Sequence, residues 1–176
     1  MPLFVQLNEA ATDQGLAFLV IGGHAVIEHG FQRGTEDVDI LVCKDDRPRW
    51  LRLVEDLGYR VFHDGGSFIQ FEAPDPSAWD LDVMFVAAET LARLRAEAQP
   101  ARVEGVCVSV PSLEHLLSLK VHALKHGHGL RVLKDLTDVA ELLAANRVDP
   151  SAPWVRALFE RYGDLETYER VVQLLT

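Results

Sequence analysis

Residues 20–42 constrain the fold of this chain more than any other segment. An apolar run ends at Gly22 and Gly23, a stretch of helical character follows, and Asp37 and Asp39 open a second apolar run. Paired glycines after a strand permit a tight turn into a helix. Because side chains alternate across a strand, Asp37 and Asp39 lie on one face and their apolar neighbours point into a core. The segment therefore predicts a strand, a glycine turn, a helix and a second strand that carries two carboxylates.

Residues 79–86 repeat this arrangement, with Asp80 and Asp82 in an otherwise apolar run. Carboxylates on one face repel each other unless a cation lies between them, and hard oxygen ligands at this spacing suit Mg²⁺ or Mn²⁺. A third carboxylate from a neighbouring strand completes the kind of two-metal site that catalyses phosphoryl transfer. We predict Asp82 as that third ligand beside Asp37 and Asp39. Asp80 is the alternative, and the competing interpretation of all four acids is a solvent-exposed strand face that carries them by chance.

The rest of the chain predicts an α+β fold class. Strand-like apolar runs occupy residues 17–21, 37–42, 59–62, 67–72 and 79–86, and a bent strand pair occupies residues 101–110. Helical periodicity occupies residues 3–11, 50–57 and 88–98 and continues from residue 111 to the end, with breaks at 127–129, 149–153 and 163. We expect residues 1–110 to form a mixed β-sheet core flanked by helices. We expect residues 111–176 to form a helical segment that packs on this core within one compact unit.

Composition limits the classes of function. The 176 residues are 48% hydrophobic and 25% charged, which is typical of one globular domain. Apolar runs are too short for a membrane span and no secretory signal opens the sequence, so we expect a cytoplasmic protein without a membrane partner. The net charge of -10 argues against sequence-independent binding to a nucleic-acid backbone. Cys43 and Cys107 lie in separate strand-like runs, which predicts two reduced, buried thiols and excludes a zinc cluster built from cysteines.

The glycine turn, the pair Asp37 and Asp39, and Asp82 together resemble the nucleotidyltransferase superfamily with the polymerase-beta-like core. The resemblance covers about residues 17–145. It implies a metal-dependent enzyme that moves a nucleoside monophosphate from an NTP to an acceptor hydroxyl, with Mg²⁺ or Mn²⁺ as cofactor. It also implies that Asp37, Asp39 and Asp82 bind the metal and act as the catalytic residues. RNA ends, a protein side chain and a small molecule all stay open as the acceptor.

Residues 33–39 are most similar to the small prokaryotic branch that includes AbiEii-type toxins and minimal nucleotidyltransferases. This similarity implies the toxin half of a toxin–antitoxin system, with a cognate antitoxin as a partner. It further implies a nucleotide-binding role for Gly22, Gly23, His24, Arg33, Thr35, Lys120 and Lys134. His24 departs from the pattern, because many members have Ser or Thr there and would contact phosphate through the hydroxyl. The alternative function is therefore a catalytically weak module that binds a nucleotide or a partner protein.

The candidate residues on the later helices have simpler alternatives. A lysine on an amphipathic helix is usually solvated, and this is the alternative for Lys120 and Lys134. Asp135 and Asp138 follow Lys134 in the same helical run, and the simple expectation for both side chains is a position on the exterior of the helix.

Overall fold

The computed structural model describes residues 3–127 and 129–175, and it divides into two compact units. The first unit draws on residues 1–25 and 33–112, and the second draws on residues 26–32 and 113–176. The glycine turn and the predicted acid residues all belong to the first unit, whereas Lys120 and Lys134 belong to the second. None of the helices in the described residues is long and apolar enough to cross a membrane.

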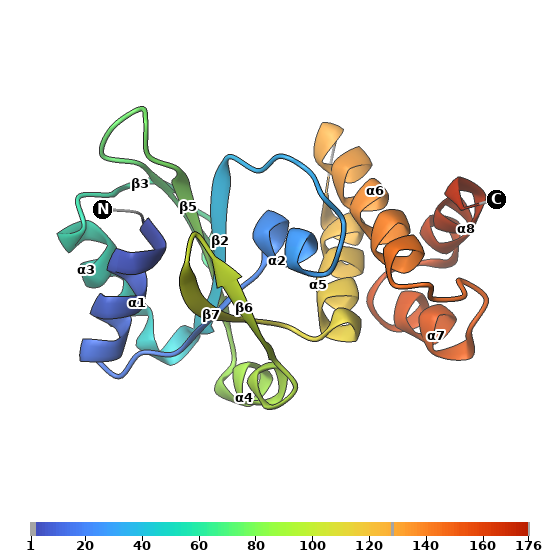
Figure 1. Cartoon of the computed structure of the whole chain (residues 1–176), viewed down its shortest axis with the longest axis horizontal. Coiled ribbons are helices and arrows are strands. Elements are labelled where there is room, and N and C mark those ends of the chain that lie inside the picture. The colour runs from blue at the N-terminus through green and yellow to red at the C-terminus, as the bar shows by residue number, and fades with distance from the viewer. Residues whose placement is uncertain (1–2, 128, 176) are drawn as a thin grey trace. The chain divides into compact units, whose positions relative to one another are not determined.

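A mixed five-stranded sheet lies at the centre of the first unit (Figure 1). Its strands are β1 (Phe18–Val20), β2 (Asp37–Cys43), β3 (Arg60–Asp64), β4 (Phe68–Glu72) and β5 (Asp80–Val86). Their spatial order is β1-β2-β5-β4-β3, with β2 and β5 parallel and the other neighbours antiparallel. A separate two-stranded sheet consists of β6 (Gln99–Val103) and β7 (Val106–Val110). The structure thus confirms the predicted α+β fold with a mixed sheet.

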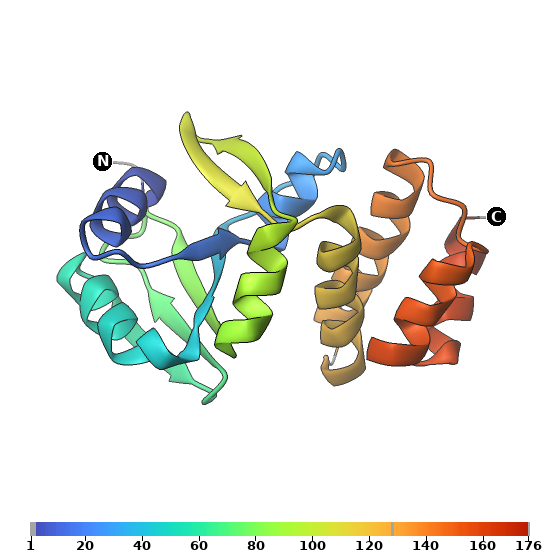
Figure 2. The same cartoon turned by 90° about the horizontal axis from the view of Figure 1, so that it is seen from below.

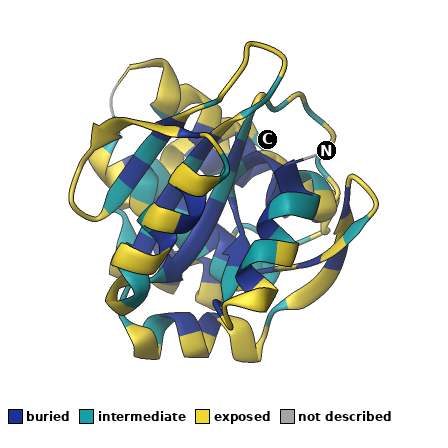
Figure 3. Ribbon diagram, turned by 90° about the vertical axis from the view of Figure 1, so that its left-hand side faces the viewer, coloured by how far each residue is buried: buried dark blue, intermediate teal, exposed yellow. Residues whose placement is uncertain are grey.

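The helices of the first unit bury their apolar faces. They are α1 (Leu3–Asp13), α3 (Arg47–Asp56) and α4 (Ala88–Ala96), and a 3-10 turn, η1 (Lys44–Asp46), precedes α3. Phe4 and Leu7 of α1 and Trp50 of α3 are almost fully buried, as their helical spacing predicts. Figure 3 shows buried residues along the strands and exposed residues on the outer turns of the helices. A further helix, α2 (Gly22–Glu28), begins directly after β1, and its last residues belong to the second unit.

The parallel strands β2 and β5 form the most deeply buried part of the sheet. Val38 and Ile40 on β2 and Leu81 and Val83 on β5 have no exposed surface. Asp39 and Asp82, which lie between them, are half-buried, as expected for strands with one apolar and one polar face. Further along β2, Leu41 is fully buried on the face that carries Asp39, so the polar part of this face is limited to the start of the strand. Burial of the apolar face fixes the register, because a shift by one residue would bring the polar residues into the core.

Four helices form most of the second unit, and Figure 2 shows them packed beside one another. They are α5 (Leu113–His126), α6 (Leu130–Ala145), α7 (Pro153–Tyr162) and α8 (Leu165–Leu174). The amide of Asn146, after α6, donates to the backbone oxygens of His29 and Leu142 at 2.8 Å each, which holds residues 26–32 against the end of α6. The predicted breaks near 127–129, 149–153 and 163 are confirmed, although residue 128 lies outside the described residues.

The prediction for the cysteines was wrong in part. Both thiols are free, but Cys107 is exposed and Cys43 is half-buried. Cys107 falls on the outward-facing side of the β6–β7 sheet, where side chains alternate between exposed and buried. An apolar run in the sequence therefore did not distinguish the inner from the outer face of this short strand.

Candidate active site

The glycine turn and the carboxylate of Asp39 are in direct contact. Gly22 has a positive φ of 61°, and a Cβ placed on it would lie 1.8 Å from Oδ2 of Asp39. A Cβ on Gly23 would lie 2.4 Å from Oγ1 of Thr35. The backbone N–H of Ile21 donates to the carbonyl oxygen of Asp39 at 2.9 Å, so the end of β1 is tied to β2 as well. These contacts require glycine at both positions and bring the turn and β2 into one site.

The two acid pairs lie opposite each other on adjacent strands. In the parallel register of β2 and β5, Asp37 pairs with Asp80 and Asp39 pairs with Asp82. Neighbouring strands are about 4.8 Å apart, and the alternation places all four carboxylates on the polar face of the sheet. The structure therefore brings the sequence-predicted acids into one group of four, two on each strand, which we call the acid row.

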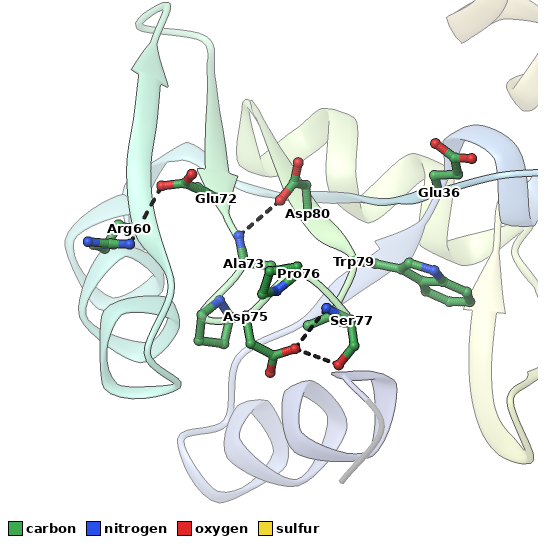
Figure 4. A pocket seen from close by; sticks show the side chains of 11 residues that line it. Glu36, Arg60, Glu72, Ala73, Asp75, Pro76, Ser77, Trp79 and Asp80 are labelled. Atoms are coloured by element: carbon green, nitrogen blue, oxygen red, sulfur yellow. Dashed lines mark hydrogen bonds and ion pairs between the residues drawn. The ribbon is translucent and has the colours of Figure 1, made fainter.

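Hydrogen bonds distinguish the two candidates for the third carboxylate. Asp82 is half-buried, and its two oxygens accept from Nε2 of Gln70 at 3.3 and 3.1 Å. Gln70 lies directly opposite Asp82 on β4. Asp80 is exposed, and its Oδ1 accepts from the backbone N–H of Ala73 at 2.9 Å (Figure 4). Asp82 thus lies within the site with an orienting side chain, whereas Asp80 caps the loop before β5.

Thr35 orients the first acid of the row. Its Oγ1 donates to Oδ1 of Asp37 at 2.8 Å, and the same hydroxyl lies next to the Cα of Gly23. The guanidinium of Arg33 lies near the same turn. Its Nη1 would be 3.2 Å from a Cβ placed on Gly23. The loop between α2 and β2 therefore brings a hydroxyl and a positive charge to the glycine turn.

His24 is buried between two aromatic side chains. Its ring centroid lies 5.0 Å from that of Phe4 in an edge-on contact and 5.1 Å from that of Trp79. The side chain is 7% exposed, and among the described residues its Nε2 has no hydrogen-bond partner. Burial lowers the pKa of His24, and the charge of Asp37, which raises the pKa, does not reverse this. The imidazole is therefore neutral at neutral pH.

The donor set of the acid row has the chemistry that a hard divalent cation requires. Carboxylate oxygens are the preferred protein ligands of Mg²⁺ and Mn²⁺, and Asp39 and Asp82 are direct neighbours on parallel strands. Within residues 3–127 and 129–175, however, no three His, Cys, Asp or Glu side chains converge on one point. Thr35 and Gln70 hold the carboxylates of Asp37 and Asp82 in this arrangement. The residues therefore fit a cation by type and strand register.

The lysines predicted for nucleotide binding lie in the helical unit and have different environments. Nζ of Lys120 lies 2.7 Å from an oxygen of Asp135 and 2.7 Å from an oxygen of Asp138. All three residues are buried, so the expectation that these two aspartates lie on the helix exterior is wrong. Burial by itself lowers the pKa of Lys120, but the charges and hydrogen bonds of the two aspartates outweigh it and raise the pKa. Lys134, by contrast, is exposed on α6.

Comparison with known proteins identifies the family. The sequence profile described as "Uncharacterised nucleotidyltransferase" matches residues 3–175. The chain belongs to this family. It is therefore a transferase of the nucleotidyltransferase superfamily, as the glycine turn and the acid pairs predicted. The match does not identify the AbiEii-type branch. None of the curated proteins compared with the chain matches it.

Solved structures support the same fold. The solution structure of the antibiotic-resistance factor ANT(2'')-Ia has a TM-score of 0.66 and 20% identity, and the match covers 95% of both chains. The lincosamide antibiotic adenylyltransferase LnuA, with lincomycin bound, has a TM-score of 0.55 and 14% identity over 79% of this chain and 95% of that chain. A nucleotidyltransferase-like structure from Thermotoga maritima has a TM-score of 0.52 and 12% identity over 81% and 91%. At these identities the structures share the fold with this chain.

The contact between Gly22 and Asp39 predicts a specific sensitivity to substitution. Gly22→Ala introduces a methyl group against Oδ2 of Asp39 in a backbone conformation with positive φ. Gly15→Ala is the matched control, because Gly15 has the same kind of φ but open space around its Cα. We expect Gly22→Ala to lower the free energy of unfolding by at least about 1 kcal/mol more than Gly15→Ala, measured by urea unfolding. Equal losses would show that the turn does not hold Asp39 tightly.

The buried ion cluster predicts a structural role for Lys120. Lys120→Met removes the ammonium from two buried aspartates, and we expect the free energy of unfolding to fall by about 3–5 kcal/mol. Lys125→Met, an exposed change on the same helix, is the control and should have little effect. A Lys120→Met protein that unfolds like the wild type but no longer binds nucleotide would contradict the structural role.

Proposed function

We propose that this protein transfers a nucleoside monophosphate from an NTP to an acceptor hydroxyl and that it requires Mg²⁺ or Mn²⁺. The observation that carries the proposal is the contact of Gly22 with the carboxylate of Asp39, which lies in register with Asp82. Family membership supports nucleotidyl transfer. The metal requirement and the roles of individual residues are part of the proposal.

Each residue of the site has its own role in the proposed reaction. Gly22 and Gly23 let the backbone of the turn lie directly against Asp39 and Thr35, so a triphosphate bound at the acid residues would lie beside this backbone, and Arg33 would offset part of its charge. Asp37 and Asp39 would hold the divalent cations, which when bound neutralise charge on the triphosphate and on the departing pyrophosphate. Asp82, oriented by Gln70, would serve as a third metal ligand or accept the proton of the acceptor hydroxyl. The reacting phosphorus is then the α phosphorus, since the β and γ phosphates leave together.

His24 bears on the alternative function, a module that binds a nucleotide without turnover. A neutral imidazole can donate one hydrogen bond in place of the hydroxyl that many superfamily members have here. The ring packs against Phe4 and Trp79 and its Nε2 is buried, so this atom is not exposed to a phosphate in the present arrangement. The retained acid residues favour the enzyme, because carboxylates on one face repel each other and a bound cation relieves that repulsion.

Structural neighbours favour a small acceptor. A crystal structure of ANT(2'')-Ia contains adenylyl-2''-tobramycin, has a TM-score of 0.65 and shares 19% identity over 92% of this chain. LnuA was crystallised with lincomycin. The net charge of -10 also disfavours a large RNA as acceptor. The toxin role and the cognate antitoxin stay predictions from the AbiEii resemblance, and co-purification with the product of a neighbouring gene tests them.

Labelled nucleotides test the reaction directly. With Mg²⁺ or Mn²⁺ present, we expect label from an α-phosphate-labelled NTP to move to an acceptor and label from the γ phosphate to stay behind, because pyrophosphate is the leaving group. The acceptor panel contains small hydroxyl compounds, total RNA and the protein itself. Asp39→Asn should reduce transfer at least about a hundredfold while the circular dichroism spectrum is retained. Transfer of the γ label would indicate a kinase, and binding without any transfer would favour the alternative module.

A pair of variants identifies the third carboxylate. Asp82→Asn should weaken Mn²⁺ binding in the presence of a non-hydrolysable NTP by at least about tenfold, since even changes outside the first ligand shell have effects of this size. Asp80→Asn should leave Mn²⁺ affinity within about twofold, because Asp80 caps the loop and its replacement can still accept from Ala73. Calorimetric titration measures both. If Asp80→Asn is the more damaging change, the assignment of the two residues is reversed.

A further inference from the structure

The end of α2 is closed by a compact backbone motif. The N–H of Gly30 donates to the carbonyl oxygen of Ile27 at 3.0 Å, and the N–H of Phe31 donates to that of Val26 at 3.3 Å. These paired bonds form a Schellman motif, for which Gly30 supplies the positive φ of 101°. The last four carbonyl groups of a helix have no donor within it, and the motif satisfies two of them. The carbonyl group of His29, directly before Gly30, therefore requires a donor from outside the helix.

Asn146 supplies this donor from the end of α6. Its side-chain amide donates to the carbonyl oxygens of His29 and Leu142, and both bonds are part-buried and 2.8 Å long. The chain turns sharply directly after Asn146, since Arg147 has a positive φ of 54°, which residues other than glycine rarely adopt. The side chain of Asn146 thus connects the ends of two helices that lie far apart in the sequence. We call these two hydrogen bonds the Asn146 clamp.

The loop that follows the clamp carries two residues of the candidate active site. Residues 30–36 connect the end of α2 to β2, and the chain passes from the second unit to the first after residue 32. Within this loop, Arg33 and Thr35 lie next to Gly23, at the beginning of α2, so the loop runs back along the helix. The hydrogen bond from Thr35 to Asp37 holds the far end of the loop. The loop is therefore anchored at both ends, by the clamp and by this bond.

The position of the Arg33 charge follows the position of this loop. Nη1 of Arg33 donates to the carbonyl oxygen of Gly34 at 2.8 Å, so the guanidinium is tied to the backbone of its own loop. Residues 30–36, all of which the structure describes, contain no helix or strand, and Gly30 and Gly34 add backbone freedom. A loop of this kind takes its conformation mainly from its anchors. Loss of either anchor would therefore let the charge of Arg33 move away from the glycine turn.

We propose that Asn146 is a positioning residue for nucleotide binding, because its clamp fixes the loop that presents Arg33 to the triphosphate. This inference rests on the proposed function, in which Arg33 offsets phosphate charge beside the glycine turn. Asn146 acts through the loop and not by contact with the nucleotide. A charge that is held in place before the nucleotide arrives loses less entropy on binding than a charge that binding must order. Removal of the clamp therefore weakens NTP binding although every group that contacts the NTP is retained.

The nucleotide affinity of Asn146→Ala tests the inference. The non-hydrolysable NTP that binds the wild type most tightly is titrated into the full chain with Mg²⁺ by calorimetry. We expect Asn146→Ala to raise its dissociation constant at least about fivefold, near the lower end of the effects of residues that support a ligand-contacting group. Tyr168→Phe is the control, because it also removes a part-buried hydrogen bond to a backbone carbonyl in the second unit, that of Pro150 at 3.1 Å. It should leave the dissociation constant within about twofold.

A double-mutant cycle identifies the route of the effect. If Asn146 acts through Arg33, Asn146→Ala should change the affinity by less than about twofold in a chain that already carries Arg33→Met. A general loss of stability would instead weaken binding by the same factor in both backgrounds. Equal factors in the two backgrounds, an unchanged affinity of Asn146→Ala, or an equal loss of affinity in Tyr168→Phe would each overturn the inference.

Hydrogen exchange separates this inference from the proposed function, because it needs no nucleotide. Asn146→Ala should speed amide exchange in residues 30–36 at least about fivefold, since the loop then opens more often. Tyr168→Phe should leave the exchange of these residues unchanged. Unchanged exchange in Asn146→Ala would overturn the inference whatever the nucleotide titrations show. Failure of the wild type to bind any NTP with Mg²⁺ would instead overturn the proposed function.

Discussion

The parallel pairing of β2 and β5 is the constraint on which the candidate site depends. Val38 and Ile40 on one strand and Leu81 and Val83 on the other are fully buried, and their packing sets the register. A shift of one residue would exchange the faces of a strand and separate the acid pairs. The positions of the polar residues that we propose for chemistry are therefore determined by the apolar residues that alternate with them. The free energy that holds the site together comes mainly from the hydrophobic core beneath it.

The glycine turn adds a constraint of a different kind, because it couples the site to the end of β1. Gly22 permits the Asp39 carboxylate to lie against the backbone, and Gly23 does the same for the hydroxyl of Thr35. A larger residue at either position would displace a carboxylate or the side chain that orients one. The backbone of the turn therefore lies beside negatively charged carboxylates. These carboxylates repel a triphosphate, so the triphosphate binds there only together with cations.

Much of the fold was predictable because its signals are local. Alternation and helical periodicity located the strands and helices, and the glycine pair with the acids indicated the superfamily. Gln70 was not predictable, because its role follows from the register of β4 against β5, which no local pattern specifies. The burial of Asp135 and Asp138 was missed for a similar reason. Helical spacing shows which residues share a face, but the ammonium of Lys120 that compensates for their burial comes from another helix.

Charge links the group of four acids to the proposed metal requirement. The chain has a net charge of -10, and the four acids would repel a free triphosphate. A nucleotide accompanied by divalent cations reverses this repulsion at Asp37 and Asp39. The register that pairs Asp37 with Asp80 and Asp39 with Asp82 therefore gathers negative charge on one sheet face, where a metal-bound nucleotide is favoured over a metal-free one.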